Sequence, residues 1–474
     1  MTLLPGRRPG DRRVRIARVR PEEIVLEQRR RARRPIPAPI VLIGGFAALI
    51  AVGTILLVLP PMSEAGTWTS PVDALFTATS AVCVTGLVVL DTATHWSLPG
   101  EVVILALIQL GGLGIATSST LLLILAMGRR TGLRDRLLVQ ESTGAPTLGS
   151  VLPLLRRIAA FTLLVQACGA AILFVSRLAA GDGPLQAAWW GIFHAGAAFN
   201  NAGFDVTGGF RSLTGSAEDP VVLGTIGALI VLGGLGYAIV ADVVVRRRWG
   251  RLALETKMVL AGTAILLVGG AAFFSLVEWG NPATLGALPP PARLLNAAFL
   301  SVTPRTAGFN SVDTGSLLVP SLFVVMGLMF VGGASGSTAG GIKVGTLGVL
   351  LVAIVSVGRG EPSAAVFGRR IPHGIVYRSL AVALLGAVVV FGGALALELA
   401  SDVDFVAVLF ETVSAFGTVG LSTGITPGLP DPALVILVVV MFIGRLGPLV
   451  FVLALAGRAR PVAHRPASET LRIG

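Results

Sequence analysis

Apolar residues along the chain form runs of two different lengths. Eight runs reach the roughly 20 residues that a membrane-spanning helix needs, at about 38–60, 99–127, 152–178, 220–245, 256–278, 317–357, 374–400 and 432–457. Four shorter stretches lie between them, near 71–82, 186–199, 292–304 and 404–416. Stretches of this shorter length are typical of re-entrant helices. The pattern predicts an all-α polytopic membrane protein in which the order span, short helix, span occurs four times.

The four short stretches end alike, which indicates an internal repeat. The chain reads FTATSAVCVTGL at 76–87, FHAGAAFNNAGF at 193–204, FLSVTPRTAGF at 299–309 and FETVSAFGTVGL at 410–421. In each copy a Phe precedes a Gly that is followed by Leu or Phe, and the third copy is one residue shorter. The four glycines are Gly86, Gly203, Gly308 and Gly420.

A glycine suits the end of a re-entrant helix because the chain must turn back through backbone angles that residues with a Cβ adopt poorly. Irregular backbone at membrane depth is tolerated only where it is buried in protein or lines a water-filled path. Four such segments around one axis would form a ring of carbonyl oxygens able to replace a cation's hydration shell. Close helix packing is the alternative for any single glycine. Four matching positions with matching flanks favour the ring.

The charges separate the two ends of the spans. The chain is 54% hydrophobic and 13% charged, whereas soluble domains carry about 25% charged residues. Its net charge of +12 comes from islands that each follow an even number of predicted spans. The islands cover residues 7–34, 129–157, 246–257, 359–378 and 458–472. The positive-inside rule therefore places both termini in the cytoplasm, and the basic surfaces suit anionic lipid or a docking partner rather than nucleic acid.

The opposite loops hold many acidic residues, including Asp205 and Glu411, and few basic ones, such as Arg305. An acidic outer mouth concentrates cations. Two cysteines, Cys83 and Cys168, cannot form a disulfide framework, and four scattered histidines make no metal cluster. No clustered acid, base or nucleophile and no dinucleotide fingerprint occur, so we expect neither an enzyme nor a bound cofactor.

A glycine-rich segment, GGASGSTAGG at 332–341, interrupts the sixth apolar run. Each Gly costs about 1 kcal/mol relative to Ala within a helix, so a broken helix is expected there. Lys343 follows this segment, where it either serves the loop or extends to the membrane interface. Arg445 lies within the eighth run, and a lone Arg costs at least about 2.5–3.5 kcal/mol in a bilayer. It must therefore face a lumen, or pair with a buried carbonyl or acid.

Taken together, the motifs resemble the Trk/Ktr/HKT superfamily of potassium transporters over about residues 38–457. They are VTGL at 84–87, NNAGF at 200–204, RTAGF at 305–309, TVGL at 418–421, GGASGSTAGGIKV at 332–344 and IGRLGP at 443–448. The resemblance implies four pseudo-symmetric helix–pore helix–helix repeats, with eight transmembrane spans and four re-entrant pore helices around one central pore. The implied segments are a basic arm (1–37), the repeats 38–150, 151–252, 253–366 and 367–457, and a cytoplasmic tail (458–474).

The same resemblance implies two sets of site residues. The K⁺ filter would comprise Val84, Thr85, Gly86, Asn201, Ala202, Gly203, Thr306, Ala307, Gly308, Thr418, Val419 and Gly420. The gate would comprise Gly332, Gly333, Ser335, Gly336, Ser337, Thr338, Gly340, Gly341, Lys343 and Arg445. Members with Ser at the first filter position tend toward Na⁺ transport, so Gly in all four repeats favours K⁺.

The resemblance also implies K⁺ as the substrate, Na⁺ as a modulator, a homodimer, and a cytoplasmic ring of nucleotide-binding subunits as partner. The expected location is the bacterial cell (inner) membrane. One span before the first pore helix favours the Ktr branch. The alternatives are a Trk-type K⁺ uptake subunit with different coupling, and a secondary carrier of another cation or a small solute. Carriers normally use inverted or two-fold repeats, which a four-fold glycine pattern does not match.

Overall fold

The structure is a computed structural model, and it describes residues 38–113, 151–448 and 450 of the 474-residue chain. The predicted arm (1–37), the tail (458–474) and the arginines at 129–136 lie outside the described residues. So do the second half of the run at 99–127 and most of the end of the run at 432–457.

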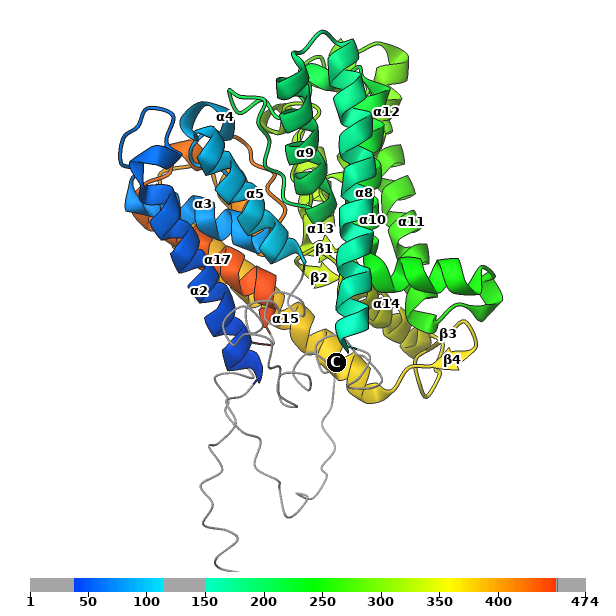
Figure 1. Ribbon diagram of the computed structural model, residues 1–474. Coiled ribbons are helices and arrows are strands. Elements are labelled where there is room, and N and C mark those ends of the chain that lie inside the picture. Colours follow the sequence, from blue (N-terminus) through cyan, green and yellow to red (C-terminus); the bar gives the residue numbers. More distant parts are fainter. Residues whose placement is uncertain (1–37, 114–150, 449, 451–474) are drawn as a thin grey trace, which may run out of the picture. The chain divides into compact units, whose positions relative to one another are not determined.

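The helices that arise from the apolar runs alternate along the chain with the helices of the four short stretches (Figure 1). The helices are α2 (Ala38–Val58), α3 (Pro71–Cys83), α4 (Thr92–His95), α5 (Leu98–Gly112), α8 (Val151–Ala179), α9 (Pro184–Asn200), α10 (Pro220–Arg246), α11 (Leu254–Val277), α12 (Pro290–Val302), α13 (Val319–Phe330), α14 (Val344–Gly358), α15 (His373–Ala400), α16 (Phe405–Gly417) and α17 (Asp431–Leu446). Single 3-10 turns lie at Pro60–Met62, Thr214–Ser216, Trp249–Arg251, Leu285–Ala287, Thr314–Ser316 and Thr426–Gly428.

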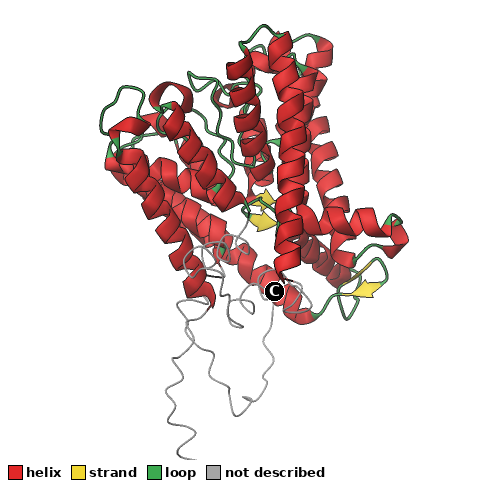
Figure 2. Ribbon diagram, viewed as in Figure 1, coloured by secondary structure: helices red, strands yellow, loops and turns green. Residues whose placement is uncertain are grey.

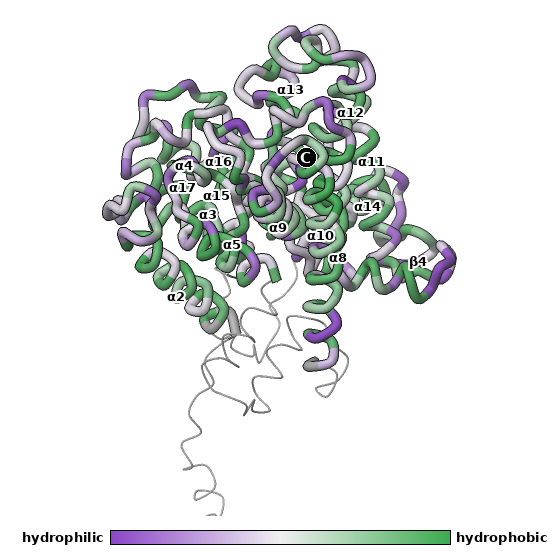
Figure 3. The backbone as a smooth tube through the Cα atoms, turned by 45° about the horizontal axis from the view of Figure 1, so that its top comes forward, coloured by the Kyte–Doolittle hydropathy of each residue, from purple (hydrophilic) through white to green (hydrophobic). Residues whose placement is uncertain are grey.

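Four of the described helices are long and apolar enough to cross a membrane, namely α8 from Pro153, α10, α11 and α15. The run at 38–60 forms α2, and the run at 317–357 is divided between α13 and α14. Large apolar side chains on the long helices face outward, and Leu276 of α11 is 83% exposed. Figure 3 shows the same apolar character along α8, α10 and α11. Such exposed apolar surface is suited to contact with lipid.

The short helices α3, α9, α12 and α16 form where the sequence predicts them. Pro is the first residue of three of them, where its fixed φ and missing N–H suit a helix start. In α16, Asp404 caps the helix by accepting a hydrogen bond from the N–H of Val406 at 3.0 Å. Their second halves are almost entirely buried. They therefore form the centre of the core, inside the long helices.

Each short helix packs against long helices of two groups. It contacts the long helix that precedes it, as α3 contacts α2 and α9 contacts α8. It also contacts a helix of the neighbouring group, and these pairs are α5 with α9, α10 with α12, α13 with α16, and α17 with α3. The last pair joins the end of the chain to its beginning. The four groups thus pack in a closed circle.

The sixth apolar run is broken, as the sequence predicts. Helix α13 ends at Phe330 and α14 begins at Val344. Between them the strands β1 (Val331–Gly332) and β2 (Ile342–Lys343) pair in parallel, with Val331 opposite Ile342 and Gly332 opposite Lys343. The pairing closes the segment 332–341 into a loop, which we call the gate loop. Figure 2 shows this strand pair among the helices.

A second strand pair carries part of the basic island at 359–378. The strands β3 (Ala365–Val366) and β4 (Arg369–Arg370) form an antiparallel hairpin. Its two-residue turn, Phe367 and Gly368, has positive φ at both positions, which matches the twist of paired strands. Both arginines of β4 are exposed.

Candidate functional site

The chain leaves each short helix through the same unusual backbone conformation. After each short helix, one residue other than Gly adopts the left-handed backbone conformation, which residues with a Cβ rarely adopt. These four residues are Val84 (φ 57°), Asn201 (φ 59°), Thr306 (φ 73°) and Thr418 (φ 48°). Two residues later each copy has a Gly with positive φ. Four repeats of one strained turn indicate a shared function for these segments.

Hydrogen bonds tie these turns to their own short helices. The N–H of Thr85 donates to the carbonyl of Ser80 at 2.7 Å, and the N–H of Gly86 donates to the Ser80 hydroxyl at 3.0 Å. In the fourth copy, Val419 and Gly420 donate to the carbonyl and hydroxyl of Ser414 in the same way, at 2.9 and 3.1 Å. The third copy differs because α12 ends at Val302, and Ala307 donates to the carbonyl of Thr303 at 3.0 Å.

The carbonyl oxygens of these turns are left without partners. Among the described residues, no hydrogen bond is made to the carbonyls of the left-handed residues or of the residues that follow them. The eight oxygens belong to Val84, Thr85, Asn201, Ala202, Thr306, Ala307, Thr418 and Val419. Buried carbonyls are nearly always satisfied, so unpaired ones at this site point to a ligand.

The four glycines meet in a closed ring. A Cβ added to any of these glycines would collide with the backbone of another copy. The atoms it would meet are the Cα of the glycine in that other copy and the carbonyl oxygen of the residue before that glycine. The contacts run from Gly86 to Ala202 and Gly203, from Gly203 to Ala307 and Gly308, from Gly308 to Val419 and Gly420, and from Gly420 to Thr85 and Gly86. We call Gly86, Gly203, Gly308 and Gly420 the glycine ring. No side chain fits within it.

A second set of glycines brings the long helices against the short ones. A Cβ on Gly111 would collide with the carbonyl of Val82, and one on Gly233 with the carbonyl of Phe199. Gly444 has the same relation to Phe416. The glycines at 111, 112 and 233 of the two LGGLG sequences therefore allow the long helices to pack closely against the short ones. Helix α10 also kinks at Gly236 (φ 73°), beside Ser337 of the gate loop.

The gate loop lies directly beside the left-handed residues. The hydroxyl of Thr338 donates to the carbonyl of Phe199 at 3.2 Å and to the side-chain oxygen of Asn201 at 3.3 Å. A Cβ on Gly340 would collide with the Thr418 hydroxyl. The loop is also held to α10, because the N–H of Ala334 donates to the carbonyl of Gly234 at 2.8 Å.

Both basic residues that the sequence singles out contact this loop. The ammonium group of Lys343 donates to the carbonyls of Ala339 and Gly340, at 2.5 and 3.1 Å. The guanidinium of Arg445 donates to the carbonyl of Thr338 at 2.5 Å and to that of Gly111 at 2.6 Å. The sequence predicts that Arg445 either faces a lumen or pairs with a buried carbonyl or acid, and the structure shows the pairing with buried carbonyls.

Sequence reasoning misplaced Glu411. The sequence groups Glu411 with the acidic residues of the outer loops, but in the structure it lies completely buried in α16. Its carboxylate accepts hydrogen bonds from the hydroxyls of Ser422 and Thr426, the latter at 3.2 Å. Both partners follow the fourth glycine, so Glu411 holds the segment that leaves the ring. Its position directly after the shared Phe410 is the signal that could have revealed this role.

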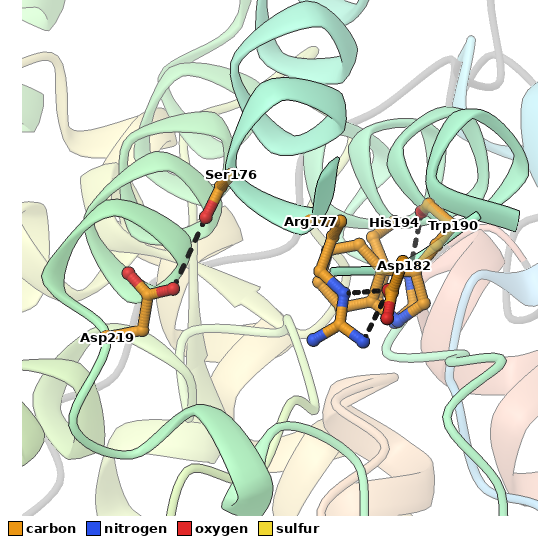
Figure 4. Close-up of polar contacts among 6 residues, drawn as sticks. All are labelled: Ser176, Arg177, Asp182, Trp190, His194 and Asp219. Atoms are coloured by element: carbon orange, nitrogen blue, oxygen red, sulfur yellow. Dashed lines mark hydrogen bonds and ion pairs between the residues drawn. The ribbon is translucent and has the colours of Figure 1, made fainter. Parts of the chain in front are cut away.

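The equivalent residue in the second copy is His194, which follows Phe193. It is completely buried, and its ring stacks on Trp190 with centroids 3.8 Å apart. Figure 4 shows Trp190 in turn beside Arg177 of α8, whose guanidinium carbon lies 5.0 Å from the indole centroid and which pairs with Asp182 at 2.7 Å. The hydroxyl of Ser176, also on α8, donates to the carboxylate of Asp219, which caps α10, at 3.3 Å. These contacts fix the second short helix against α8.

Asp205 stands two residues after Gly203, at the start of the loop that leaves the ring. Burial raises the pKa of its carboxyl to about 6, the hydrogen bond from the N–H of Thr207 opposes that shift, and the nearby charge of Asp91 adds to it. The carboxyl therefore changes its charge near neutral pH.

Comparison with known proteins identifies the family. Residues 45–459 match the TrkH family, described as a cation transport protein. The chain belongs to the TrkH family. The match covers all four short helices, the glycine ring and the gate loop of this TrkH family chain.

Individual relatives refine that assignment. The chain is 40% identical to Ktr system potassium uptake protein B of Bacillus subtilis, over 91% of this chain and 96% of that protein. It is 37% identical to the protein of the same name from Vibrio alginolyticus, over 92% and 95%. It is also 37% identical to the potassium/sodium uptake protein NtpJ of Enterococcus hirae, over 91% and 95%. These relatives support the predicted Ktr-like branch of the TrkH family.

A solved structure shares the fold. The crystal structure of the potassium transporter TrkH from Vibrio parahaemolyticus matches with a TM-score of 0.69 and 16% identity, covering 89% of this chain and 85% of that one. The relatives are transport proteins, which confirms that the chain is a transporter rather than an enzyme.

Proposed function

We propose that the chain takes up potassium ions across a bacterial cell membrane, through one central pore enclosed by four helix–pore helix–helix repeats with eight spans. The potassium uptake activity named for its relatives supports this substrate. The selectivity filter in this proposal consists of the glycine ring and the two residues before each of its glycines. The eight unpaired carbonyls of those residues replace the hydration shell of the ion.

The closed ring of glycine contacts is the observation that carries the proposal. Each glycine meets the carbonyl of a neighbouring copy, and the fourth meets Thr85 of the first. A backbone ring with uncommitted oxygens suits a bare monovalent cation, since a side-chain site would distinguish organic solutes by their polar groups. This argues for ion uptake over a carrier of small solutes. The remaining alternative is Trk-type uptake with different coupling.

In this proposal the gate loop closes the pore next to the filter. Thr338 bonds to Asn201, and Gly340 abuts Thr418, so the loop occupies the space that an ion must cross. Lys343 and Arg445 hold the loop in place through its carbonyls. Their positive charges also oppose the passage of a cation. Transport then requires that the loop move away from the filter.

A cytoplasmic partner would move that loop. The basic islands at 246–257 and 359–378 meet where Trp249 contacts Phe367, with ring centroids 6.0 Å apart. The ammonium group of Lys257 lies 6.0 Å from the same Phe367 ring. Trp249 and Phe367 are half exposed, at 50% and 45%. Exposed aromatic rings among arginines suit a protein interface.

We therefore propose that this surface and the island at 129–157 bind a nucleotide-binding regulatory ring. In this proposal the chain forms a homodimer, and both of its termini lie in the cytoplasm. The test is co-purification of the ring with the Arg369→Ala/Arg370→Ala variant and with Arg211→Ala, whose arginine lies in another exposed loop. Binding that is lost in the first and kept in the second supports the assignment. Equal binding by both variants contradicts it.

Rescue of a potassium-uptake-deficient bacterium on low-K⁺ medium tests the function itself. The native chain, supplied with its partner, should restore growth, and Gly203→Ser should weaken rescue or admit Na⁺. Membrane insertion of both chains is checked by immunoblot. Failure of the inserted native chain to restore growth would refute potassium uptake. Na⁺, which appears in the name of one relative, is included as a modulator by repeating the assay with and without it.

A further inference from the structure

A small cavity lies beside the third filter segment, among α10, α11, the end of α12 and the gate loop. Its walls are mostly aliphatic and include Ile230 and Leu235 of α10 and Leu267 of α11. Two polar side chains line it, Thr263 of α11 and Arg305, and Gly333 forms its edge at the gate loop. It has room for about one water-sized particle. Neither the proposed filter nor the proposed gate makes use of this cavity.

Both polar side chains in the cavity have hydrogen-bond donors without partners. Arg305 is only 7% exposed, and its Nε finds no acceptor. Thr263 is 6% exposed, and its hydroxyl also has no partner. Other buried side-chain atoms of the described residues also lack a partner, so neither group is unusual alone. Here two such groups line the same cavity.

The isolation of Arg305 distinguishes it from the other buried arginine near the filter. The Nε of Arg445 also lacks an acceptor, but its other two guanidinium nitrogens donate to backbone carbonyls. Within the described part of the chain, no hydrogen bond from the Arg305 side chain is found, and the ion pairs there are formed by Arg177 and Arg246 instead. A buried charge without a partner is strongly destabilising. The sequence placed Arg305 in an outer loop, where water would have solvated it, and burial overturns that placement.

The chemistry of the site selects its occupant. A guanidinium group only donates hydrogen bonds, and a Thr hydroxyl can donate one as well. Aliphatic walls favour a weakly hydrated particle, and the small volume excludes a phosphate or a lipid headgroup. Water would satisfy the donors but leave the positive charge uncompensated. We propose that the cavity holds a monatomic anion of the chloride type, bound by Arg305 and Thr263.

This anion would act on the filter through charge. Arg305 directly precedes Thr306, whose carbonyl belongs to the filter in the proposed function. An uncompensated positive charge there repels a cation in the ring, and a bound anion offsets that repulsion. Potassium and the anion therefore each strengthen the binding of the other, because such coupling is reciprocal. The anion site itself does not depend on the proposed function.

Thermal unfolding of the purified full-length chain in lipid nanodiscs tests the site. Its midpoint is measured in potassium chloride, potassium bromide and potassium gluconate at equal potassium concentration and ionic strength. Gluconate is too large for the cavity. We expect midpoints a few degrees higher in chloride and bromide than in gluconate, because a ligand that binds the folded state stabilises it. Equal midpoints in all three salts would overturn the proposal.

Variants place the effect at the cavity. Thr263→Val keeps the shape of the side chain but removes the donor, and Arg305→Gln removes the charge. The difference between halide and gluconate should shrink in both, and Arg211→Gln, which removes an exposed arginine elsewhere, should keep it. An undiminished difference in Thr263→Val and Arg305→Gln would assign the anion to another site.

A direct measurement covers the case in which Arg305→Gln does not fold. Crystals of the native chain grown with bromide should show an anomalous scattering peak within hydrogen-bond distance of Arg305 and Thr263. A cavity without that peak at saturating bromide, in a map that shows the neighbouring side chains, would refute anion binding there and leave water as the occupant.

Discussion

Arg445 and Thr338 are joined by a hydrogen bond of 2.5 Å, from the guanidinium group to the backbone carbonyl, although 107 residues separate them in the chain. The bond ties the last described helix to the gate loop. Thr338 also contacts Asn201, so Arg445 is one step away from the proposed filter.

Removing this arginine should loosen the gate. We expect Arg445→Ala to raise potassium flux severalfold in proteoliposomes that lack the regulatory partner, because the loop loses a charge-assisted hydrogen bond and the pore loses a positive charge. Deletion of residues 335–338 should do the same. The control is Arg211→Ala, which changes an exposed arginine in an outer loop. If both arginine variants leak equally, the gate does not depend on Arg445.

The glycine ring can be tested with a pair of glycines that share one backbone conformation. Gly420 has φ 94° and Gly424 has φ 95°, but only at Gly420 would a Cβ collide with another copy's backbone. Gly420→Ala should therefore abolish potassium uptake, and Gly424→Ala should cost only the strain of its conformation, about 1–2 kcal/mol of stability. Growth on low K⁺ and the unfolding midpoint separate the two effects. Equal loss of growth in both variants, at equal membrane levels, would argue against a special role for the ring.

Glu411 should control the selectivity of the fourth filter segment. Glu411→Gln leaves one acceptor oxygen for two hydroxyls, so a buried hydrogen bond is lost at a cost of about 1–3 kcal/mol. The segment after Gly420 then moves more freely, and we expect the ratio of potassium to sodium flux to fall. Glu398→Gln, on the exposed side of α15, is the matched control. If the selectivity of Glu411→Gln is unchanged, Glu411 does not control selectivity and its role is structural.

Uptake should depend on external pH through Asp205. Because burial raises the pKa of this carboxyl to about 6, its negative charge is present at pH 7.5 and is lost as the pH falls through 6. Potassium uptake should fall over that interval in the native chain. Asp205→Asn should show low uptake at both ends of the range, with no step near pH 6.

The same carboxyl should affect stability with a definite sign. A folded-state pKa above the unfolded value means that folding favours the protonated acid, so this contribution to stability is present below about pH 4 and disappears as the pH rises through 6. Asp205→Asn should therefore raise the unfolding midpoint at pH 7.5 and leave it nearly unchanged at pH 4. A variant that is less stable at pH 7.5 would show that the carboxylate is structural.

The sequence alone predicts the helices closely because their signals are local. Apolar run length distinguishes the four short stretches from the longer runs, and the prolines that open α3, α9 and α12 mark where three of the short helices begin. The glycines of the gate loop predict the break between Phe330 and Val344 because helices tolerate them poorly. The repeated Phe and Gly positions also predict that four segments come together. The filter and gate roles assigned to these residues remain predictions.

Local signals of this kind do not predict which distant segments contact one another. A charged residue within or directly after a short apolar stretch resembles a loop residue, so the sequence places Glu411 and Arg305 in outer loops, although tertiary packing buries both. The order of contacts around the glycine ring likewise depends on which long helix packs against which short one. The kink at Gly236 arises where α10 meets the gate loop, and the one Pro of α10 is its first residue, far from the kink.

The contact between Gly420 and Thr85 has a consequence for synthesis. The first three glycines emerge from the ribosome and can pack against one another, but the ring lacks its last side until α16 has been made and inserted. If the ring is the proposed filter, a chain that is still being synthesised has no complete filter until its fourth copy has joined the other three.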